Sequence, residues 1–449
     1  MDRRSFLLRG AGAVSGVAAA ALSGAPPAWA GEGFTRPGPS PYGDIEGRTA
    51  DHNGVVLPQG FRSRVVAVGG QTVAGTNYRW HPFSDGGATI ADAEGGWYYV
   101  SNSEVFEPVE QGGASAIRFD ASGTIIGAAR ILDHTTGNCA GGASPWGTWL
   151  SCEEHATGRV WDCDPAGATD PVRLDALGVF RHEAVAASPE FTSLFMTEDE
   201  PDGLLYRFVP DRWPDLSAGR LQALRVDGPR TVWIDVPDAS ASALPTRSQV
   251  PDATVFTGGE GICYREGFVY FTTKYDNRVH LLDLQRESYA VVWDGTEPLF
   301  TVDNITADPV AGQLFIAEEG GNMEIVIIDT KGNVAPFLRV EGHPDSEVAG
   351  VAFSPDGTRL YFSSQRAPTE THLDDLFPGV EDDRPVGMVF EVEGPFLTKQ
   401  MHAARIVDRG EGGSGGPSPA PYVAAGGSLV VAGVVAALAI RGRRSHLPN

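Results

Sequence analysis

The sequence predicts an all-β protein, a six-bladed β-propeller, on the strength of two observations. Short alternating strands dominate the middle of the 449-residue chain, whereas helical periodicity is scarce. One strand pattern also returns at a nearly constant interval along the chain. A fixed period of several short strands indicates a repeat architecture in which each unit is one blade.

The repeated unit is a turn rich in glycine, aspartate or proline, then an apolar strand, then a polar end. It occurs at residues 94–104, 144–154, 188–200, 265–276, 310–320 and 354–366. Between equivalent positions the steps are 52, 45, 75, 45 and 46 residues, and periods of about 40–50 residues are typical of propeller blades. We expect the long step to contain an insertion, residues 201–255. Two β-sandwich domains are the alternative fold, but they would not explain the common spacing.

Polar residues recur at the two places that a propeller would bring to its channel. An apolar segment before each turn is the expected innermost strand, and the turn returns the next strand antiparallel to it. The start of the first strand and the end of the second therefore lie on one face. The starts carry Asp85, Asn138, His182, Glu183, Glu260, Asp303, Asn304 and Glu347, and the ends carry Glu104, Cys152, Glu153, Glu154, Glu198, Asp199, Glu200, Glu318 and Glu319.

Such a ring of carboxylates cannot stay ionised and empty in a channel of low dielectric constant. Like charges a few ångströms apart repel strongly, so they must take protons or bind cations. Oxygen ligands in this number suit Ca²⁺, and a thiolate among them points to a transition metal as well. In the stretch WGTWLSCEEH (146–155), Glu154 is expected on the same side of the strand as Cys152, and Glu153 on the other.

The composition of the chain excludes some classes of binding partner. The formal net charge is −24 and the pI near 4.7, so nucleic acid and anionic lipid are poor partners. Four cysteines without a CxxC pair do not define a disulfide framework. One disulfide, with Cys139 or Cys163 as a partner, stays open.

The two ends of the chain predict export and anchoring. Residues 1–30 read as a twin-arginine signal, with Arg3 and Arg4 and an A-x-A cleavage site at 28–30. The expected propeller domain is 31–406, followed by a Gly/Ser/Pro linker at 407–421. An uncharged stretch at 422–440 is long enough for a transmembrane helix, and a basic cytoplasmic tail follows at 441–449. We therefore expect a domain on the outer face of the cytoplasmic membrane or on the cell surface.

Several motifs resemble the PhoX family of alkaline phosphatases. They are NCAGGASPWGTWLSCEE (138–154), RHEAVA (181–186), FMTEDE (195–200), EGICY (260–264), VDNITAD (302–308) and EVAGVAFSPDG (347–357). The resemblance covers about residues 51–396. It implies twin-arginine export, a six-bladed propeller, and hydrolysis of phosphate monoesters at a mixed iron and calcium cluster bridged by an oxo group.

The resemblance also implies the metal ligands. Cys152 would bind iron, and the metal set would be Cys152, Glu153, Glu154, Glu183, Glu198, Glu260, Asp303 and Glu318, with their division between iron and calcium left open. Bound cations would attract an anionic phosphate ester that bare carboxylates repel. A metal-held oxygen would be the nucleophile, and Arg366 is the candidate phosphate contact.

The chain also departs from the family pattern. It is shorter than characterised members, and it reads RAP after Gln365 where many relatives have His-Pro-Gly. Two other functions stay open. A lactonase-like propeller would hold a single divalent ion, with Asn138 and Asn304 as suitable ligands. A non-catalytic surface propeller would bind partners and use metals only to stiffen its channel.

Overall fold

The computed structural model describes residues 35–106, 111–295, 297–377 and 380–397. The predicted signal peptide, linker, transmembrane segment and basic tail lie outside these ranges. Within the described ranges, no helix has the length and apolar character needed to cross a membrane.

The regular secondary structure of the described residues is almost entirely β-strand, so the predicted all-β class is confirmed. Two sheets hold the first and second repeats: β4 (Ser84–Ala91), β5 (Trp97–Ser103), β6 (Gly112–Phe119) and β7 (Ile125–Thr135); then β8 (Asn138–Ala143), β9 (Trp149–Glu153), β10 (Val160–Cys163) and β11 (Val172–Arg173). Helical turns are short: η1 (Asp175–Leu177), η2 (Thr246–Gln249) and α2 (Leu373–Leu376).

A larger sheet joins the third and fourth repeats. Its strands are β12 (His182–Ser188), β13 (Ser193–Glu198), β14 (Leu205–Arg212), β15 (Asp215–Asp227), β16 (Arg230–Asp235), β20 (Ser288–Asp294), β19 (Arg278–Asp283), β18 (Phe268–Thr273) and β17 (Gly259–Arg265). Only one residue pair, Arg230 with Ser288, links β16 to β20. Strands β14 to β16 lie within the expected insertion at 201–255, so much of that segment is regular outer sheet and not an irregular loop.

The last two repeats form the remaining sheets. One contains β21 (Val302–Ala307), β22 (Leu314–Glu318), β23 (Glu324–Ile328) and β24 (Asn333–Val340), with the short strands β1 (Arg36–Pro37) and β2 (Val55–Val56) added to β24. The other contains β25 (Val348–Phe353), β26 (Arg359–Ser364), β27 (Met388–Glu393) and β3 (Arg62–Val68).

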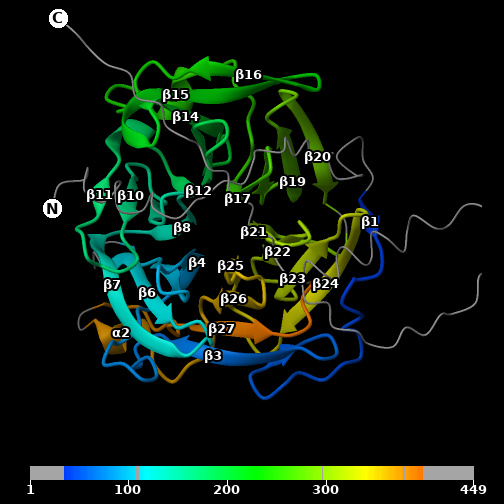
Figure 1. The fold of residues 1–449 in the computed structure, drawn as a ribbon. Helices are drawn as coiled ribbons and strands as arrows, with labels where there is room; N and C mark the ends of the chain where they lie inside the picture. The colour runs from blue at the N-terminus through cyan, green and yellow to red at the C-terminus, as the bar shows by residue number, and fades with distance from the viewer. Residues whose placement is uncertain (1–34, 107–110, 296, 378–379, 398–449) are drawn as a thin grey trace, which may run out of the picture. The chain divides into compact units, whose positions relative to one another are not determined.

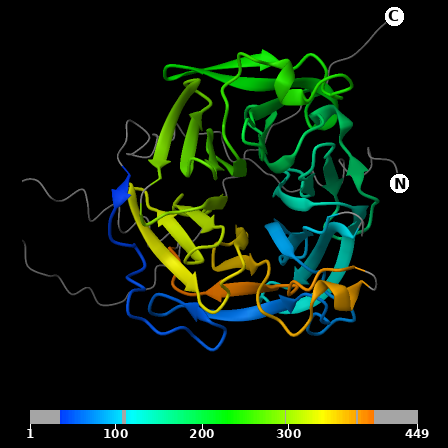
Figure 2. The same cartoon turned by 180° about the vertical axis from the view of Figure 1, so that it is seen from behind.

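The sheets are arranged around a common centre, as in a β-propeller (Figures 1 and 2). Their inner strands contact one another in a closed order: β4, β8, β12, β17, β21, β25 and again β4. Closure depends on both ends of the described chain, because β3 pairs antiparallel with β27. The innermost strand of each repeat is a short edge strand of its sheet, and it lies against the inner strands of the two neighbouring repeats.

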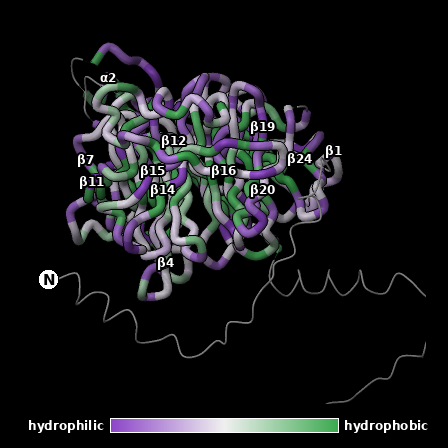
Figure 3. The backbone as a smooth tube through the Cα atoms, turned by 90° about the horizontal axis from the view of Figure 1, so that it is seen from above, coloured by the Kyte–Doolittle hydropathy of each residue, from purple (hydrophilic) through white to green (hydrophobic). Residues whose placement is uncertain are grey.

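Apolar side chains fill the space between adjacent sheets. In one such layer Phe315 of β22 meets Phe353 of β25 edge to face, with ring centroids 4.9 Å apart. Figure 3 shows hydrophobic strand segments inside and hydrophilic loops around them. The alternating strand pattern therefore has a direct structural cause, since each strand buries its apolar face against a neighbouring sheet.

Small residues let the inner strands approach closely at the centre. A Cβ atom added to Gly86 of β4 would lie 2.3 Å from the Cα atom of Ala140 in β8. A Cβ atom on Gly261 of β17 would lie 2.6 Å from the amide nitrogen of Ile305 in β21. Real Cβ atoms do not come so near, so glycine is required at these two crossings.

We expect Gly86→Ala to lower the free energy of unfolding by roughly 1–3 kcal/mol, because the added methyl group overpacks the contact with β8. Urea unfolding measures the change. Gly127→Ala in β7 is the matched control, since its Cβ atom would meet Arg118 at an ordinary 3.8 Å. Equal stability of the two variants would contradict this account of the centre.

Candidate metal centre

A β-bulge near the start of the inner strands places the first series of site residues. In β4, β8, β12, β17 and β21 the register with the second strand shifts just after the first residue. The residue that follows that first one is, in order, Asp85, Cys139, Glu183, Glu260 and Asp303. A bulge re-aims a side chain that regular pleating would send elsewhere. In β25 the same place is held by Ala349.

The second series begins where the neighbouring strands end. In each repeat, the first residue of the inner strand pairs with the last residue of the strand that follows it in the chain. Asn138 pairs in this way with Glu153, and His182 with Glu198. The next residue along the second strands is, in order, Glu104, Glu154, Asp199, Lys274, Glu319 and Gln365. The expected meeting of strand starts and strand ends is therefore what the structure shows.

Members of the two series come together in three groups. In each group the candidate ligand atoms all lie within 4.8 Å of one another, and the groups are Asp85–Glu104–Cys139, Cys139–Glu154–Glu183 and Glu183–Glu260–Asp303. The groups share Cys139 and Glu183, so they form one continuous cluster. The Cys139 thiol donates to Glu183 Oε1 at 3.3 Å. The other oxygen, Glu183 Oε2, is buried without a hydrogen-bond partner in the described structure.

Burial and mutual repulsion raise the pKa values of this cluster. Removal from water is the main reason that the pKa values of Asp85, Glu183, Glu260 and Asp303 lie well above the usual range. Neighbouring carboxylates raise the pKa of Glu183 further. The pKa of the Cys139 thiol is also raised well above its usual value by burial. Without cations these groups therefore favour their neutral forms.

The donor set fits bound metal ions. It combines several carboxylate oxygens with one thiol. Glu183 is only 1% exposed, and its Oε2 atom accepts no hydrogen bond in the described structure. Buried acceptors are normally satisfied, so such an atom needs an explanation. A cation bound by the cluster would supply the missing partner and offset the repulsion.

Basic side chains border the cluster. Arg181 Nη2 donates to Glu154 Oε1 at 2.5 Å. Arg366 Nη1 lies 3.1 Å from Glu347 Oε2, and its side chain is 23% exposed. Gln365 Nε2 donates to Glu104 Oε2 at 2.7 Å and also to Asp85 Oδ2. The arginines therefore provide positive charge next to the carboxylates without being fully buried.

The predicted ligands Glu154, Glu183, Glu260 and Asp303 lie within the three groups, but Cys152 does not. Cys152 packs in an apolar cluster with Leu150 and Val160. Cys152 and Glu154 were expected on one side of the strand, and the structure places them in different surroundings. Strand β9 ends at Glu153, and the amide of Glu154 then bonds to the carbonyl of Gly137, so the regular alternation stops between them.

Glu153, Glu198 and Glu318 also lie outside the three groups. All three end a second strand, and their carboxylates accept hydrogen bonds from nearby backbone amides. Glu198 has two further partners, the Tyr206 hydroxyl at 2.8 Å and Arg247 Nη1 at 3.2 Å. In this arrangement these glutamates fix the loops beside the cluster.

Cys139, Asp85 and Glu104 belong to the three groups, although the sequence interpretation did not name them as metal ligands. A positional signal was available, because Cys139 follows Asn138 at the same place in the repeat where Glu183 follows His182. The disulfide question is also answered, since Cys139, Cys152, Cys163 and Cys263 are all free thiols in the structure. Asp85, Glu104 and Asp199 were expected in the ring, although not as named ligands.

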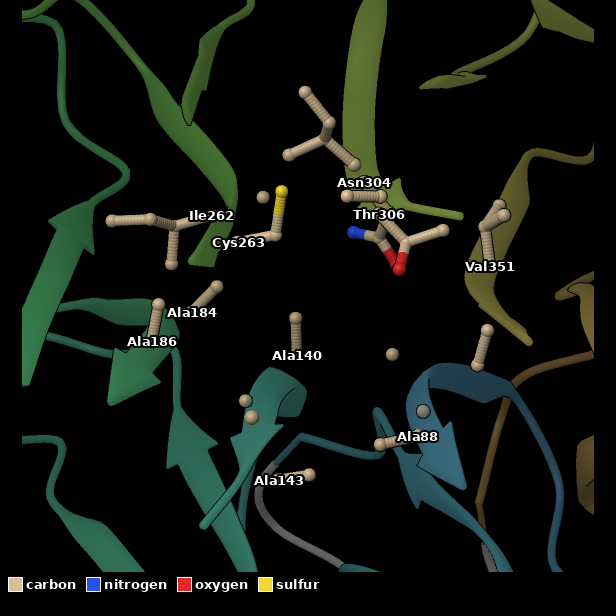
Figure 4. A pocket seen from close by; sticks show the side chains of 18 of the residues that line it. Ala88, Ala140, Ala143, Ala184, Ala186, Ile262, Cys263, Asn304, Thr306 and Val351 are labelled. Carbon is tan, nitrogen blue, oxygen red and sulfur yellow. The ribbon is translucent and has the colours of Figure 1, made fainter. Parts of the chain in front are cut away.

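The channel has a second, chemically different part. A cavity of about 340 Å³ is lined by small and apolar residues of the inner strands, among them Ala140, Ala184 and Val351 (Figure 4). Its lining includes no charged side chain. Asn304 lines this cavity and reaches the cluster, because its Nδ2 donates to Asp303 Oδ1 at 2.8 Å. The charged chemistry is thus confined to the other part of the channel.

The fold and the cluster together define a propeller-like protein with an acidic centre that could hold metal ions. Comparison of sequences shows a similarity to one family: the model described as alkaline phosphatase PhoX matches residues 120–298. The resemblance to the PhoX family is therefore confirmed over the segment that contains Cys139, Glu154, Glu183 and Glu260. A comparison with curated proteins gave no match.

The chain is also similar to solved structures, and the first of them has the same type of fold. Pseudomonas fluorescens PhoX in complex with vanadate, a transition state analogue, is similar with a TM-score of 0.63 and 18% identity, covering 77% of this chain and 97% of that one. A gluconolactonase from Xanthomonas campestris has a TM-score of 0.44 and 12% identity, covering 75% and 90% of the two chains.

We expect Glu198 to make stability fall as the pH rises. Burial raises its pKa from 4.5 to about 7, so its contribution is fully present below pH 4.5 and is lost as the pH rises through about 7. That shift corresponds to at most about 3 kcal/mol. Urea unfolding of wild type and Glu198→Gln at several pH values should show a steeper decline for wild type, whereas parallel curves would exclude this role.

Proposed function

We propose that the protein is an extracytoplasmic, metal-dependent phosphatase that hydrolyses phosphate monoesters at an iron and calcium cluster in the channel. The observation that carries the proposal is the convergence of buried carboxylates and one thiol, with Glu183 Oε2 left unpartnered. The PhoX match over residues 120–298 supports the phosphatase class. The twin-arginine pattern and the uncharged stretch at 422–440 support export and anchoring at the membrane.

The three groups divide by donor chemistry. The Cys139 thiolate suits iron, whereas groups of carboxylates alone, such as Glu183, Glu260 and Asp303, suit calcium. Metals bound here would polarise the phosphoryl oxygens and supply the nucleophile and the charge stabilisation that hydrolysis needs. The residues of the two series would then hold the metal ions in fixed positions, because the inner-strand bulges set the positions of the side chains.

Arg366 is the chain's own candidate for holding the substrate. Its guanidinium is partly exposed beside the cluster and is held by Glu347. A guanidinium offers a planar set of donors that matches phosphate oxygens. It would orient the phosphate monoester over the cluster, with Glu347 positioning the arginine.

We also propose that the ring consists of six blades, with the larger sheet divided into two. The single residue pair between β16 and β20 supports this division, because each of the other strand pairs along that sheet contains several residue pairs.

Cysteine substitutions show which thiol binds iron: Cys152, as the family resemblance implies, or Cys139, as the geometry of the cluster indicates. Cys139→Ala should remove most of the bound iron and reduce phosphomonoesterase activity roughly 100-fold or more, since loss of groups that merely support a ligand already costs about 10–100-fold. Cys152→Ala should keep the iron and lose only some stability, because Cys152 packs among apolar side chains. Elemental analysis and a phosphatase assay measure both effects.

The opposite pattern, with iron lost only from Cys152→Ala, would restore Cys152 as the ligand. A wild-type protein that holds iron and calcium and hydrolyses no phosphate monoester would refute the phosphatase assignment. In that case hydrolysis of lactones by the same preparation would indicate the lactonase-like alternative.

Arg366→Gln should raise KM for a phosphate monoester by roughly 10–100-fold, as expected when a hydrogen bond to a charged group is lost. Metal content should stay at the wild-type value. Arg286→Gln is the control. In the described structure the ion pair of Arg286 is with Asp283, three residues earlier in a surface turn. An unchanged KM in Arg366→Gln would remove Arg366 from the substrate site.

A further inference from the structure

Lys274 breaks the pattern of the second series. In the equivalent place the other second strands are followed by Glu104, Glu154, Asp199, Glu319 or Gln365, so carboxylates dominate and only this position carries a positive charge. Lysine is also rare here: the chain has three, Lys274, Lys331 and Lys399. A lysine among these carboxylates therefore calls for a specific reason.

The ammonium group of Lys274 lies between carboxylates from three different sheet segments. Its Nζ atom is 2.7 Å from Glu260 Oε1, 3.0 Å from Asp199 Oδ2 and 4.0 Å from Glu319 Oε2. Asp199 and Glu260 are each only 4% exposed. Asp199 Oδ1 has no hydrogen-bond partner in the described structure, so the acidic surroundings still have an unused acceptor.

This arrangement is the one that a cation site would have. A divalent cation such as Ca²⁺ takes oxygen ligands from several carboxylates at about 2.3–2.6 Å, slightly closer than the contacts of Lys274. An ammonium group is a compact point charge on a flexible chain, whereas a guanidinium is broad and planar. Arg181, which also approaches Asp199, stays 4.0 Å from Oδ2. Of the two, Lys274 comes nearer to the position that an ion would occupy.

We propose that Lys274 is a built-in counter-cation that occupies a position in the ring where a divalent cation would otherwise bind. The inference rests on the proposed metal-dependent function. Lys274 balances part of the negative charge of Asp199, Glu260 and Glu319 and keeps the space between these three carboxylates free of an additional metal ion. The proposed metals then lie only in the groups that contain Cys139 and Glu183. Removal of the ammonium group opens a new divalent-cation site.

The test compares calcium binding by the full-length wild type and by Lys274→Gln. We expect the variant to bind one additional Ca²⁺ per chain in equilibrium dialysis followed by elemental analysis. In a chelating buffer its melting temperature should fall below that of wild type, because three carboxylates have lost their counter-charge. Millimolar calcium should raise the melting temperature of Lys274→Gln by more degrees than that of wild type, since the added ion replaces the ammonium group.

Two matched variants separate this role from a general effect of charge. Lys331→Gln removes an exposed lysine in the turn before β24 and should leave calcium binding at the wild-type value. The double variant Lys274→Gln with Asp199→Asn removes one ligand together with the lysine, so it should not gain the extra ion. It also remains usable if the single variant folds poorly, because it restores part of the charge balance.

Lys274→Gln with the calcium content of wild type and no larger thermal response to calcium would overturn the inference. So would an equal gain in the double variant. These outcomes are distinct from failure of the proposed function, which is read from the wild type alone: a wild type without iron or calcium refutes the metal centre, whatever the variant binds.

Discussion

The repulsion among buried carboxylates is the constraint on which the rest of the centre depends. Asp85, Glu183, Glu260 and Asp303 come from four inner strands in three sheets and are removed from water together. In a medium of low dielectric constant their negative charges are compatible only with bound protons or nearby cations. The propeller brings them together because its inner strands converge, and the convergence itself needs small residues at the crossings. Packing and electrostatics are therefore opposed at the centre, and positive charge resolves the conflict.

The chain supplies part of that positive charge itself. Arg181, Lys274 and Arg366 each form an ion pair with an acidic residue of the ring. The lining of the small-residue cavity has no charged side chain. Within the three groups, Glu154 and Glu260 have basic partners, whereas Asp85, Glu183 and Asp303 form no ion pair with a basic residue of the described structure. These three carboxylates are therefore the ones that most need protons or bound cations.

Much of this arrangement could be predicted from the repeat. The period of the strand pattern predicted an all-β, propeller-like fold, and the antiparallel return within each unit predicted that strand starts and strand ends meet. Regular alternation failed as a guide at the bulges. It placed Cys152 beside Glu154, whereas the bulged inner strand aims Cys139 at the carboxylates and leaves Cys152 in the apolar layer. A bulge is a departure of one residue, and no residue type marks it in a single sequence. Strands β14 to β16 were missed for another reason: the Pro, Asp and Arg content of residues 201–255 favoured an insertion between two repeats.

The pairing of β3 with β27 has a consequence for the order in which the protein is made. The strand that completes the last sheet comes from the beginning of the described chain, near Arg62, and its partner ends at Glu393. During synthesis β3 therefore stays without its partner strand until the ribosome has made nearly the whole domain, including β27. The ring of sheets is complete only at that last step. Any ion that the centre holds would therefore enter a finished ring only after translation of the last strand.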